Sequence, residues 1–130
     1  AWTFSGNAGV AGNGSGFTLN NPNAPQGTQV GFLQKTGSIS QVVNFSAGSY
    51  TISFEAAQRA NYQASSQTFA VEVDGTVVGT FTPSSTSYAT YTTNAFTVTA
   101  GTHTVSFVGL DPNGGDNTAL LDNASIAAVN

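Results

Sequence analysis

The sequence has 130 residues, which is enough for one domain with a two-layer hydrophobic core. Only 6% of them are charged, against roughly 25% in an ordinary globular domain, so hydroxyl and amide side chains must keep the surface soluble. A net charge of −4 with two basic residues excludes a patch that neutralises nucleic acid, and no apolar run reaches the ~20 residues that cross a bilayer. The absence of cysteine excludes disulfides, thiolate catalysis and cysteine-ligated zinc.

Nine segments alternate apolar and polar residues with a period of two, which is the pattern of half-buried strands. In chain order they cover residues 2–5, 29–34, 38–45, 50–58, 68–73, 76–82, 91–98, 103–108 and 119–127. Turn residues separate them, and Asp74-Gly75 is the strongest hairpin signal. No helical period is sustained. The pattern predicts an all-β fold, an antiparallel β-sandwich or jelly roll of about 8–9 strands, as a single domain over residues 1–130.

The start of the chain suggests a module of a larger protein. Ala1-Trp2 lacks an initiator methionine and a signal peptide, so we expect a monomeric module taken from a longer secreted chain. The lack of cysteine favours a bacterial extracellular protein over an animal one. Residues 2–17 hold five glycines and predict a long loop, with one of Trp2 and Phe4 in the core.

One motif occurs twice: residues 45–54 read FSAGSYTISF and residues 98–107 read VTAGTHTVSF. Each copy predicts the end of one strand, an Ala-Gly turn and a second strand, which together form a hairpin. His103 stands where the first copy has Tyr50, and it is expected to be a half-buried strand residue. Beyond the shared Ser-Phe the copies differ, so residues 55–62 and 108–117 are expected to carry the specific chemistry.

A cluster of amide, basic and aromatic residues, Gln58, Arg59, Asn61 and Tyr62, follows the first copy. Arginine presents five donors in a rigid fork, amides both donate and accept, and tyrosine offers a flat apolar ring. Sugar hydroxyls donate and accept hydrogen bonds and sugar C–H faces stack on rings, so these residue types favour carbohydrate recognition. An ion pair between Arg59 and Glu55, with Tyr62 packed in a loop, is a purely structural explanation of the same residues and stays open.

The segment after the second copy is rich in hard oxygen ligands, which Asp111, Asn113, Asp116, Asn117 and Asp122 supply. A calcium site is therefore one hypothesis, but an EF-hand is excluded, because the sixth loop position is Asp116 rather than glycine and no helices flank the loop. Hydrogen-bonded turns are the alternative explanation of Asp111 and Asn113. We expect Asp116 and Asn117 to form a second wall of the sugar site.

Catalytic groups are sparse in this sequence. It has no Gly-x-Ser-x-Gly nucleophile elbow, and a glycosidase requires two facing carboxylates. Glu55 and Glu72 are candidate neighbours on one sheet face, although nothing in the sequence fixes their separation. The chain is therefore predicted not to be an enzyme itself, although it can be part of a larger hydrolase or lyase.

Several stretches resemble galactose-binding-like jelly-roll modules. Residues 25–33 (PQGTQVGFL), 38–43 (SISQVV) and 48–54 (GSYTISF) resemble early strands of these modules, residues 71–79 (VEVDGTVVG) their central hairpin, and residues 121–126 (LDNASI) their closing strand. The resemblance implies a non-catalytic carbohydrate-binding module of the kind appended to secreted bacterial polysaccharide-degrading enzymes. In such modules an aspartate of the closing strand ligates a structural calcium, a role that falls here on Asp122.

The residues and the resemblance together predict an extracellular module that binds a polysaccharide or oligosaccharide, with no nucleic-acid or membrane partner. The predicted ligand-binding residues are Gln58, Arg59, Asn61, Tyr62, Asp116 and Asn117. Asp122 is the predicted metal ligand, and structural calcium is the one cofactor considered. Two other functions remain as alternatives: a structural or adhesive repeat domain of a bacterial surface protein, and a small polysaccharide lyase or hydrolase.

Overall fold

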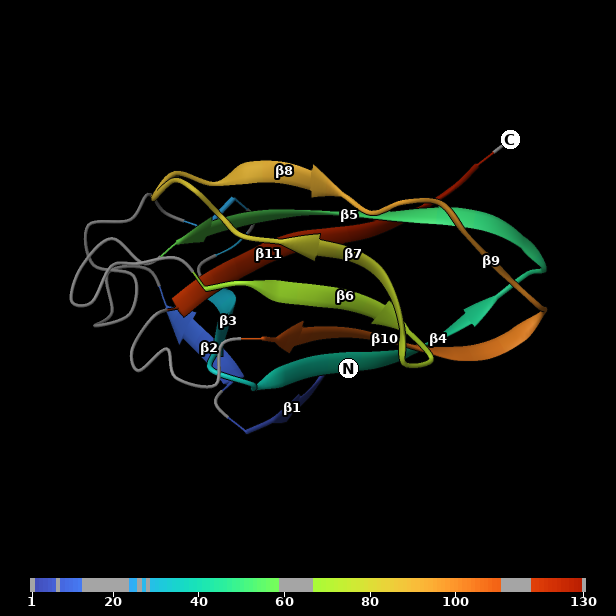
Figure 1. Ribbon diagram of the computed structural model, residues 1–130, viewed down its shortest axis with the longest axis horizontal. Coiled ribbons are helices and arrows are strands. Elements are labelled where there is room, and N and C mark those ends of the chain that lie inside the picture. The colour runs from blue at the N-terminus through green and yellow to red at the C-terminus, as the bar shows by residue number, and fades with distance from the viewer. Residues whose placement is uncertain are drawn as a thin grey trace.

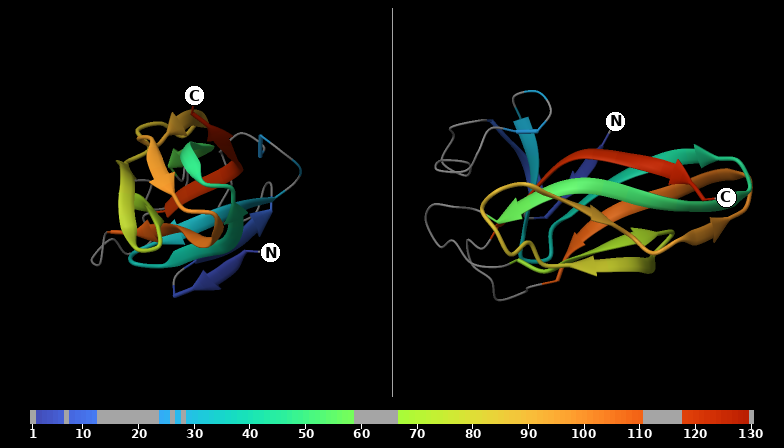
Figure 2. Two further views of the ribbon diagram at one scale, coloured as in Figure 1. Left: turned by 90° about the vertical axis from the view of Figure 1, so that its right-hand side faces the viewer. Right: turned by 90° about the horizontal axis from the view of Figure 1, so that it is seen from above.

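The computed structural model describes residues 2–6, 8–12, 24–25, 27, 29–58, 67–110 and 118–129. Within these residues eleven β-strands form two antiparallel sheets that pack face to face (Figures 1 and 2). Sheet A contains, in spatial order, β1 (Thr3–Ser5), β4 (Ser38–Phe45), β10 (Gly101–Gly109), β6 (Phe69–Val73) and β7 (Thr76–Phe81). Sheet B contains β2 (Ala8–Gly12), β3 (Gln29–Gln34), β11 (Thr118–Ala128), β5 (Gly48–Gln58) and β8 (Ala89–Thr92), and β9 (Phe96–Val98) also pairs with β5.

The predicted all-β sandwich is confirmed, and the segments 29–34 and 38–45 coincide with β3 and β4. The strand count exceeds the prediction because β2 lies inside the glycine-rich segment that was expected to be a loop. A Cβ atom at Gly9 would stand 3.0 Å from the ring of Phe32 on β3, so a larger residue there would require this ring to shift. A strand with glycine at such a position carries no alternating pattern.

The second extra strand arises where the predicted segment 91–98 divides into β8 and β9. At the break the Thr93 N–H donates to Ile52 O (2.9 Å), and the Thr93 hydroxyl accepts from Ile52 N (3.0 Å). The Thr93 hydroxyl therefore accepts the hydrogen bond that a backbone carbonyl accepts in a regular strand pair. The next N–H, from Asn94, donates to Val78 O of sheet A (3.0 Å), so the break ties the two sheets together at one edge.

The hairpin predicted at Asp74-Gly75 is confirmed between β6 and β7. Asp74 has φ 52° and Gly75 has φ 81°. Positive φ at both central residues is what a two-residue type I′ turn requires, and Asp-Gly meets that requirement.

The two hairpins predicted from the repeated motif are wrong, because each copy crosses from one sheet to the other. β4 in sheet A leads to β5 in sheet B, and β9 in sheet B leads to β10 in sheet A. Phe45 pairs with Gly101, and Val98, its equivalent in the second copy, pairs with Gly48. The two copies therefore pair with each other, because the last strand residue before each crossover lies opposite the glycine of the other copy. Three Cα–Cα steps separate the paired positions that flank each crossover, and they span about 10 Å when extended. This matches the ~10 Å between packed sheets, so the same short sequence serves as a crossover.

The hydrophobic core lies between the sheets and is rich in aromatic side chains. Phe54 of β5, 1% exposed, occupies its centre. Its ring centroid lies 5.2 Å from that of Phe107 and 5.1 Å from that of Phe81, both edge-on. At the crossover end, Phe45 packs edge-on against Tyr50 with centroids 4.9 Å apart and closes this end of the core. No helix in the described part of the chain is long and apolar enough to span a membrane.

Candidate functional site

The strands that follow the two copies of the motif end together. β5 and β10 begin at the crossovers and run in the same direction toward the opposite end of the sandwich (Figure 1). Gln58, the last residue of β5, is half-buried and its N–H donates to Ser85 O (2.8 Å). The register partner of Gln58 is Ala119, which directly follows the first residue of β11.

The other predicted ligand-binding residues lie outside the described residues: Arg59, Asn61, Tyr62, Asp116 and Asn117. Their attachment points are nevertheless known. Arg59 follows Gln58, and Asn117 precedes Thr118, which is the neighbour of the Gln58 partner. The two predicted walls are therefore joined to adjacent strands of sheet B at one end of the molecule.

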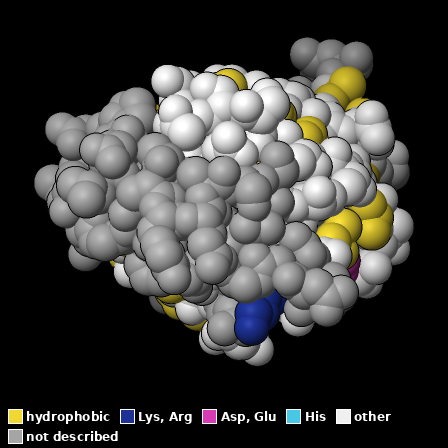
Figure 3. All heavy atoms as spheres, turned by 60° about the vertical axis from the view of Figure 1, so that its left-hand side comes forward, with side chains coloured by type: hydrophobic (Ala, Val, Ile, Leu, Met, Phe, Trp, Pro, Cys, Tyr) yellow, Lys and Arg dark blue, Asp and Glu magenta, His cyan; other side chains and the backbone are white. Residues whose placement is uncertain are grey.

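Buried polar side chains support this end of the sandwich, and sequence reasoning did not single them out. Gln34 donates from Nε2 to the Thr118 hydroxyl (2.9 Å), and both residues are buried. Gln67, 0% exposed, donates from Nε2 to Lys35 O (2.8 Å). A Cβ at Gly109 would stand 2.2 Å from that same carbonyl, so glycine is required there. Figure 3 shows the surface on this side, and Lys35 is the one lysine or arginine among the residues that the structure describes.

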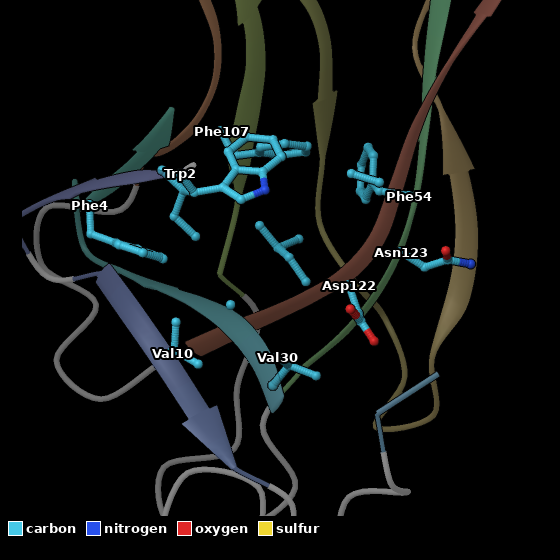
Figure 4. A pocket seen from close by; sticks show the side chains of 12 residues that line it. Trp2, Phe4, Val10, Val30, Phe54, Phe107, Asp122 and Asn123 are labelled. Atoms are coloured by element: carbon cyan, nitrogen blue, oxygen red, sulfur yellow. The ribbon is translucent and has the colours of Figure 1, made fainter. Parts of the chain in front are cut away.

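A cavity of about 270 Å³ opens between the sheets near β1 and β11 (Figure 4). Trp2 and Phe4 form one wall, and Asp122 and Asn123 form part of the opposite rim. The sequence placed one of the two aromatic residues in the core, but both are 39% exposed. The Trp2 ring contacts Phe107 at the bottom of the cavity, with centroids 6.0 Å apart.

Asp122, the predicted metal ligand, lies on β11 directly opposite Glu55 of β5. Asn123 follows in a β-bulge with φ 52°, and its Nδ2 donates to Glu55 Oε2 (2.9 Å). The hydroxyl of Tyr88 is buried without a hydrogen bond from any described residue, and burial together with the charge of Asp122 raises the pKa of Tyr88 to about 12. No group of three or more acidic, histidine or cysteine side chains that could hold a metal occurs among the described residues.

The sequence-based pairing of Glu55 with Glu72 is wrong. Glu55 belongs to sheet B and Glu72 to sheet A, and each points to the outer side of its own sheet. The motif that carries Glu55 crosses between sheets, so the two glutamates lie on opposite faces of the sandwich. The carboxylate that faces Glu55 is that of Asp122.

A second cavity of about 310 Å³ lies at the crossover end and includes His103 and Asp74. His103 is a half-buried residue of β10, as predicted, with 14% of its side chain exposed. Its Nδ1 lies 2.5 Å from Asp74 Oδ2 and its Nε2 lies 2.8 Å from Thr99 O. Both ring nitrogens face acceptors, and this arrangement favours the protonated imidazole, in which both nitrogens donate.

This contact shifts both titrations. The hydrogen bond to Asp74, followed by that to Thr99 O, raises the pKa of His103 above its usual 6.5. The hydrogen bond from His103, followed by that from Thr104 N, lowers the pKa of Asp74 below its usual 3.8. His103 therefore links Asp74 of the β6–β7 hairpin to Thr99 of the second crossover, and this geometry fits a structural role better than that of a catalytic base.

Comparison with known proteins shows the fold and leaves the function to be argued from the residues. No protein-family model and no curated protein sequence matches the chain. Solved structures match over almost its whole length. CBM36 in complex with calcium and xylotriose has a TM-score of 0.64 at 17% identity, covering 98% of this chain and 99% of that one. TmCBM61 in complex with β-1,4-galactotriose has a TM-score of 0.67 at 16% identity, covering 98% and 88%. A cyclase from Fischerella sp. TAU has a TM-score of 0.69 at 16% identity, covering 98% and 84%.

We predict a stability optimum near pH 5 that depends on the pair of Asp74 and His103. The raised pKa of His103 gives stabilisation that is present below pH 6.5 and is lost as pH rises through the folded-state pKa. The lowered pKa of Asp74 gives stabilisation that is present above pH 3.8 and is lost as pH falls through the folded-state pKa. The denaturant concentration at the unfolding midpoint should therefore decrease as the pH is raised from 5 to 9. In Asp74→Asn this decrease should be smaller. An equal decrease in Asp74→Asn and the unmodified protein would contradict the prediction.

Proposed function

We propose that this chain is a non-catalytic carbohydrate-binding module that targets a larger secreted bacterial protein to a polysaccharide. The observation that carries the proposal is the register pair of Gln58 and Ala119. It joins the amide- and arginine-rich segment after β5 and the Asp/Asn-rich segment before β11 to neighbouring strands. Both segments carry groups that donate to and accept from sugar hydroxyls.

The proposed binding residues are Gln58, Arg59, Asn61, Tyr62, Asp116 and Asn117. Two matching structures were solved with oligosaccharides, xylotriose and β-1,4-galactotriose, which supports a sugar as the ligand. At identities of 16–17% this support reaches the fold and not individual residues. The proposed site is therefore argued from the chemistry of these six residues and from the positions where β5 ends and β11 begins.

A structural or adhesive domain is the second candidate, and one observation favours it. The outer face of sheet A is a nearly uncharged surface of small hydroxyl residues, and no aromatic residue of the described chain lies on it. Its members on β1, β4 and β10 include Thr3, Ser5, Ser38, Ser40, Thr102, Thr104 and Ser106. Such a face stays soluble without recognising a ligand. A small hydrolase or lyase is third, with Glu55 and Asp122 as its facing carboxylates.

Replacement of Arg59 by alanine should abolish retention on polysaccharide. Removal of a charged hydrogen-bonding partner from a binding site costs about 3 kcal/mol, or roughly 100-fold in affinity. Retention of the isolated domain on insoluble xylan and β-1,4-galactan measures the loss, and the melting temperature should stay nearly unchanged.

Lys35→Gln is the matched control, because it removes the other basic charge at the same end of the sandwich. If general attraction to an acidic polysaccharide explained retention, both variants would weaken it equally and salt would do the same. Unchanged retention in Arg59→Ala would refute the site.

Joint replacement of Asp116 and Asn117 by alanine should weaken binding by about tenfold or more, because each hydrogen bond to a sugar hydroxyl contributes about 1 kcal/mol. Isothermal titration with the oligosaccharide that the retention assay identifies measures the change. Thr102→Ala, an exposed position on β10 at the crossover end of the sandwich, serves as the matched control. Loss of folding, with normal binding by the protein that remains folded, would assign these two residues to structure.

We also propose that Asp122 stabilises the domain through calcium. Carboxylate oxygens are the ligands that calcium prefers, and the carboxylates of Asp122 and Glu55 lie opposite each other on adjacent strands. Like charges in that position are destabilising, so a cation beside them would be favourable. A capping role, in which Asp122 accepts hydrogen bonds from the adjacent bulge, is the alternative.

Calcium should raise the melting temperature and a chelator should lower it, since a metal that binds only the folded state stabilises it by mass action. Thermal unfolding in calcium and in EDTA measures the difference, and Asp122→Asn should remove it. A melting temperature that is the same in both buffers would rule out calcium and leave the capping role.

A further inference from the structure

The cavity between β1 and β11 lies beside an unpaired stretch of strand. β3 pairs with β11 from Thr118 to Leu121 only, while β5 pairs with β11 on the other side as far as Ala128. From Asn123 to Ala128, no described residue forms a backbone pair with β11 on the side of β3. This stretch therefore offers a row of backbone donors and acceptors next to the cavity.

Two apolar side chains that face the interior of the sandwich are exposed, Phe4 on β1 and Ile126 on the unpaired stretch of β11. Phe4 pairs with buried Ile39, and Ile126 pairs with buried Ile52, so both point to the inner side of their sheets. Phe4 is nevertheless 39% exposed and Ile126 is 38% exposed. Inner-facing apolar residues with this exposure indicate that the two sheets do not cover each other at this edge.

The lining of the cavity does not suit a sugar. Apart from Gly31, Asp122 and Asn123, the residues around it are apolar. Most hydroxyls of a buried sugar ring would find no partner there, and each buried unpaired hydroxyl costs roughly 1–3 kcal/mol. The cavity of about 270 Å³ is also smaller than the ~300–1,000 Å³ of sites for drug-sized ligands. One large apolar side chain suits it better.

The exposed surface is too small for a stable dimer. The exposed parts of Trp2, Phe4, Val10 and Ile126 amount to roughly 350 Å², given ~150–250 Å² for a large side chain. A specific dimer buries about 800 Å² on each partner, whereas an apolar patch of 300–600 Å² commonly marks a functional groove. A second copy of the chain is therefore a poor occupant, and a single strand is a good one.

We propose that β11 pairs from Asn123 to Ala128 with an extended peptide segment from outside these 130 residues. The segment would continue sheet B beyond Gly31 and place one aromatic or large aliphatic side chain in the cavity against Trp2 and Phe4. Backbone hydrogen bonds would give the affinity, and the cavity would select the side chain.

Disulfide trapping tests this directly, because the chain has no cysteine and an introduced thiol is therefore unique. The protein is made as Ala124→Cys, whose side chain is exposed and lines the cavity. The probe is the peptide acetyl-Lys-Thr-Phe-Thr-Cys-Thr-Lys-amide, in which phenylalanine and cysteine share one face of an extended strand. The mixed disulfide should resist roughly tenfold more reductant than that of Val42→Cys, an exposed position on the outer face of sheet A.

Two further readouts separate the alternatives. Trp2 is the single tryptophan, so its emission should shift to shorter wavelength when the peptide is trapped. A peptide with proline in place of both threonines beside phenylalanine cannot form the ladder and should be trapped no better than at Val42→Cys. Should Ala124→Cys fail to fold, Ile126→Cys takes its place.

Equal resistance to reductant at the cavity and at Val42→Cys, or an unchanged result with the proline peptide, would refute the proposal. A shift of Trp2 emission with xylotriose or β-1,4-galactotriose would assign the cavity to sugars instead. A shift that grows with protein concentration in the absence of peptide would assign it to a second copy of the chain.

Discussion

The distance between the two sheets is the constraint on which the rest of this structure depends. Two crossovers bridge it at one end, and each has just two residues between the paired positions that flank it. These links are long enough only when the chain is extended, so they fix both the spacing of the sheets and the direction of β5 and β10. Phe45 and Tyr50 close the core at this end. The last residues of β5 and β10 lie at the other end of the sandwich.

Much of the fold follows from alternation, and the errors show where alternation stops being informative. β3 and β4 were predicted with their bounds because both segments carry the period-two pattern and turn residues flank them. β2 was missed because its glycines interrupt the alternating pattern, and the ring of Phe32 that packs over Gly9 is distant in sequence. The hairpins were wrong because an Ala-Gly pair fits both a tight turn and a crossover, and only the pairing of Phe45 with Gly101 separates the two.

The candidate site was less predictable for the same reason. Asp122 was predicted as a metal ligand from the resemblance. That it lies opposite Glu55 could not be predicted, because the pairing depends on the register between two strands far apart in the chain. Gln67 and Gly109 both approach the backbone carbonyl of Lys35 at the end of the sandwich where β5 and β10 finish, and no sequence pattern indicates such a meeting. The roles of Arg59, Asn61, Tyr62, Asp116 and Asn117 remain predictions. Their residue chemistry is visible in the sequence, whereas their geometry lies outside the described residues.

The position of β11 within sheet B governs the order in which the protein can fold. This strand is the last in the sequence, yet it lies between β3 and β5 and separates them. Neither β3 nor the inner edge of β5 can complete its hydrogen bonds until residues 118–128, which form β11, have been synthesised. During synthesis the chain therefore carries a divided sheet with two open edges, a state that exposes it to aggregation. Correct folding of the domain depends on keeping this intermediate apart from its copies until β11 is available to pair with β3 and β5.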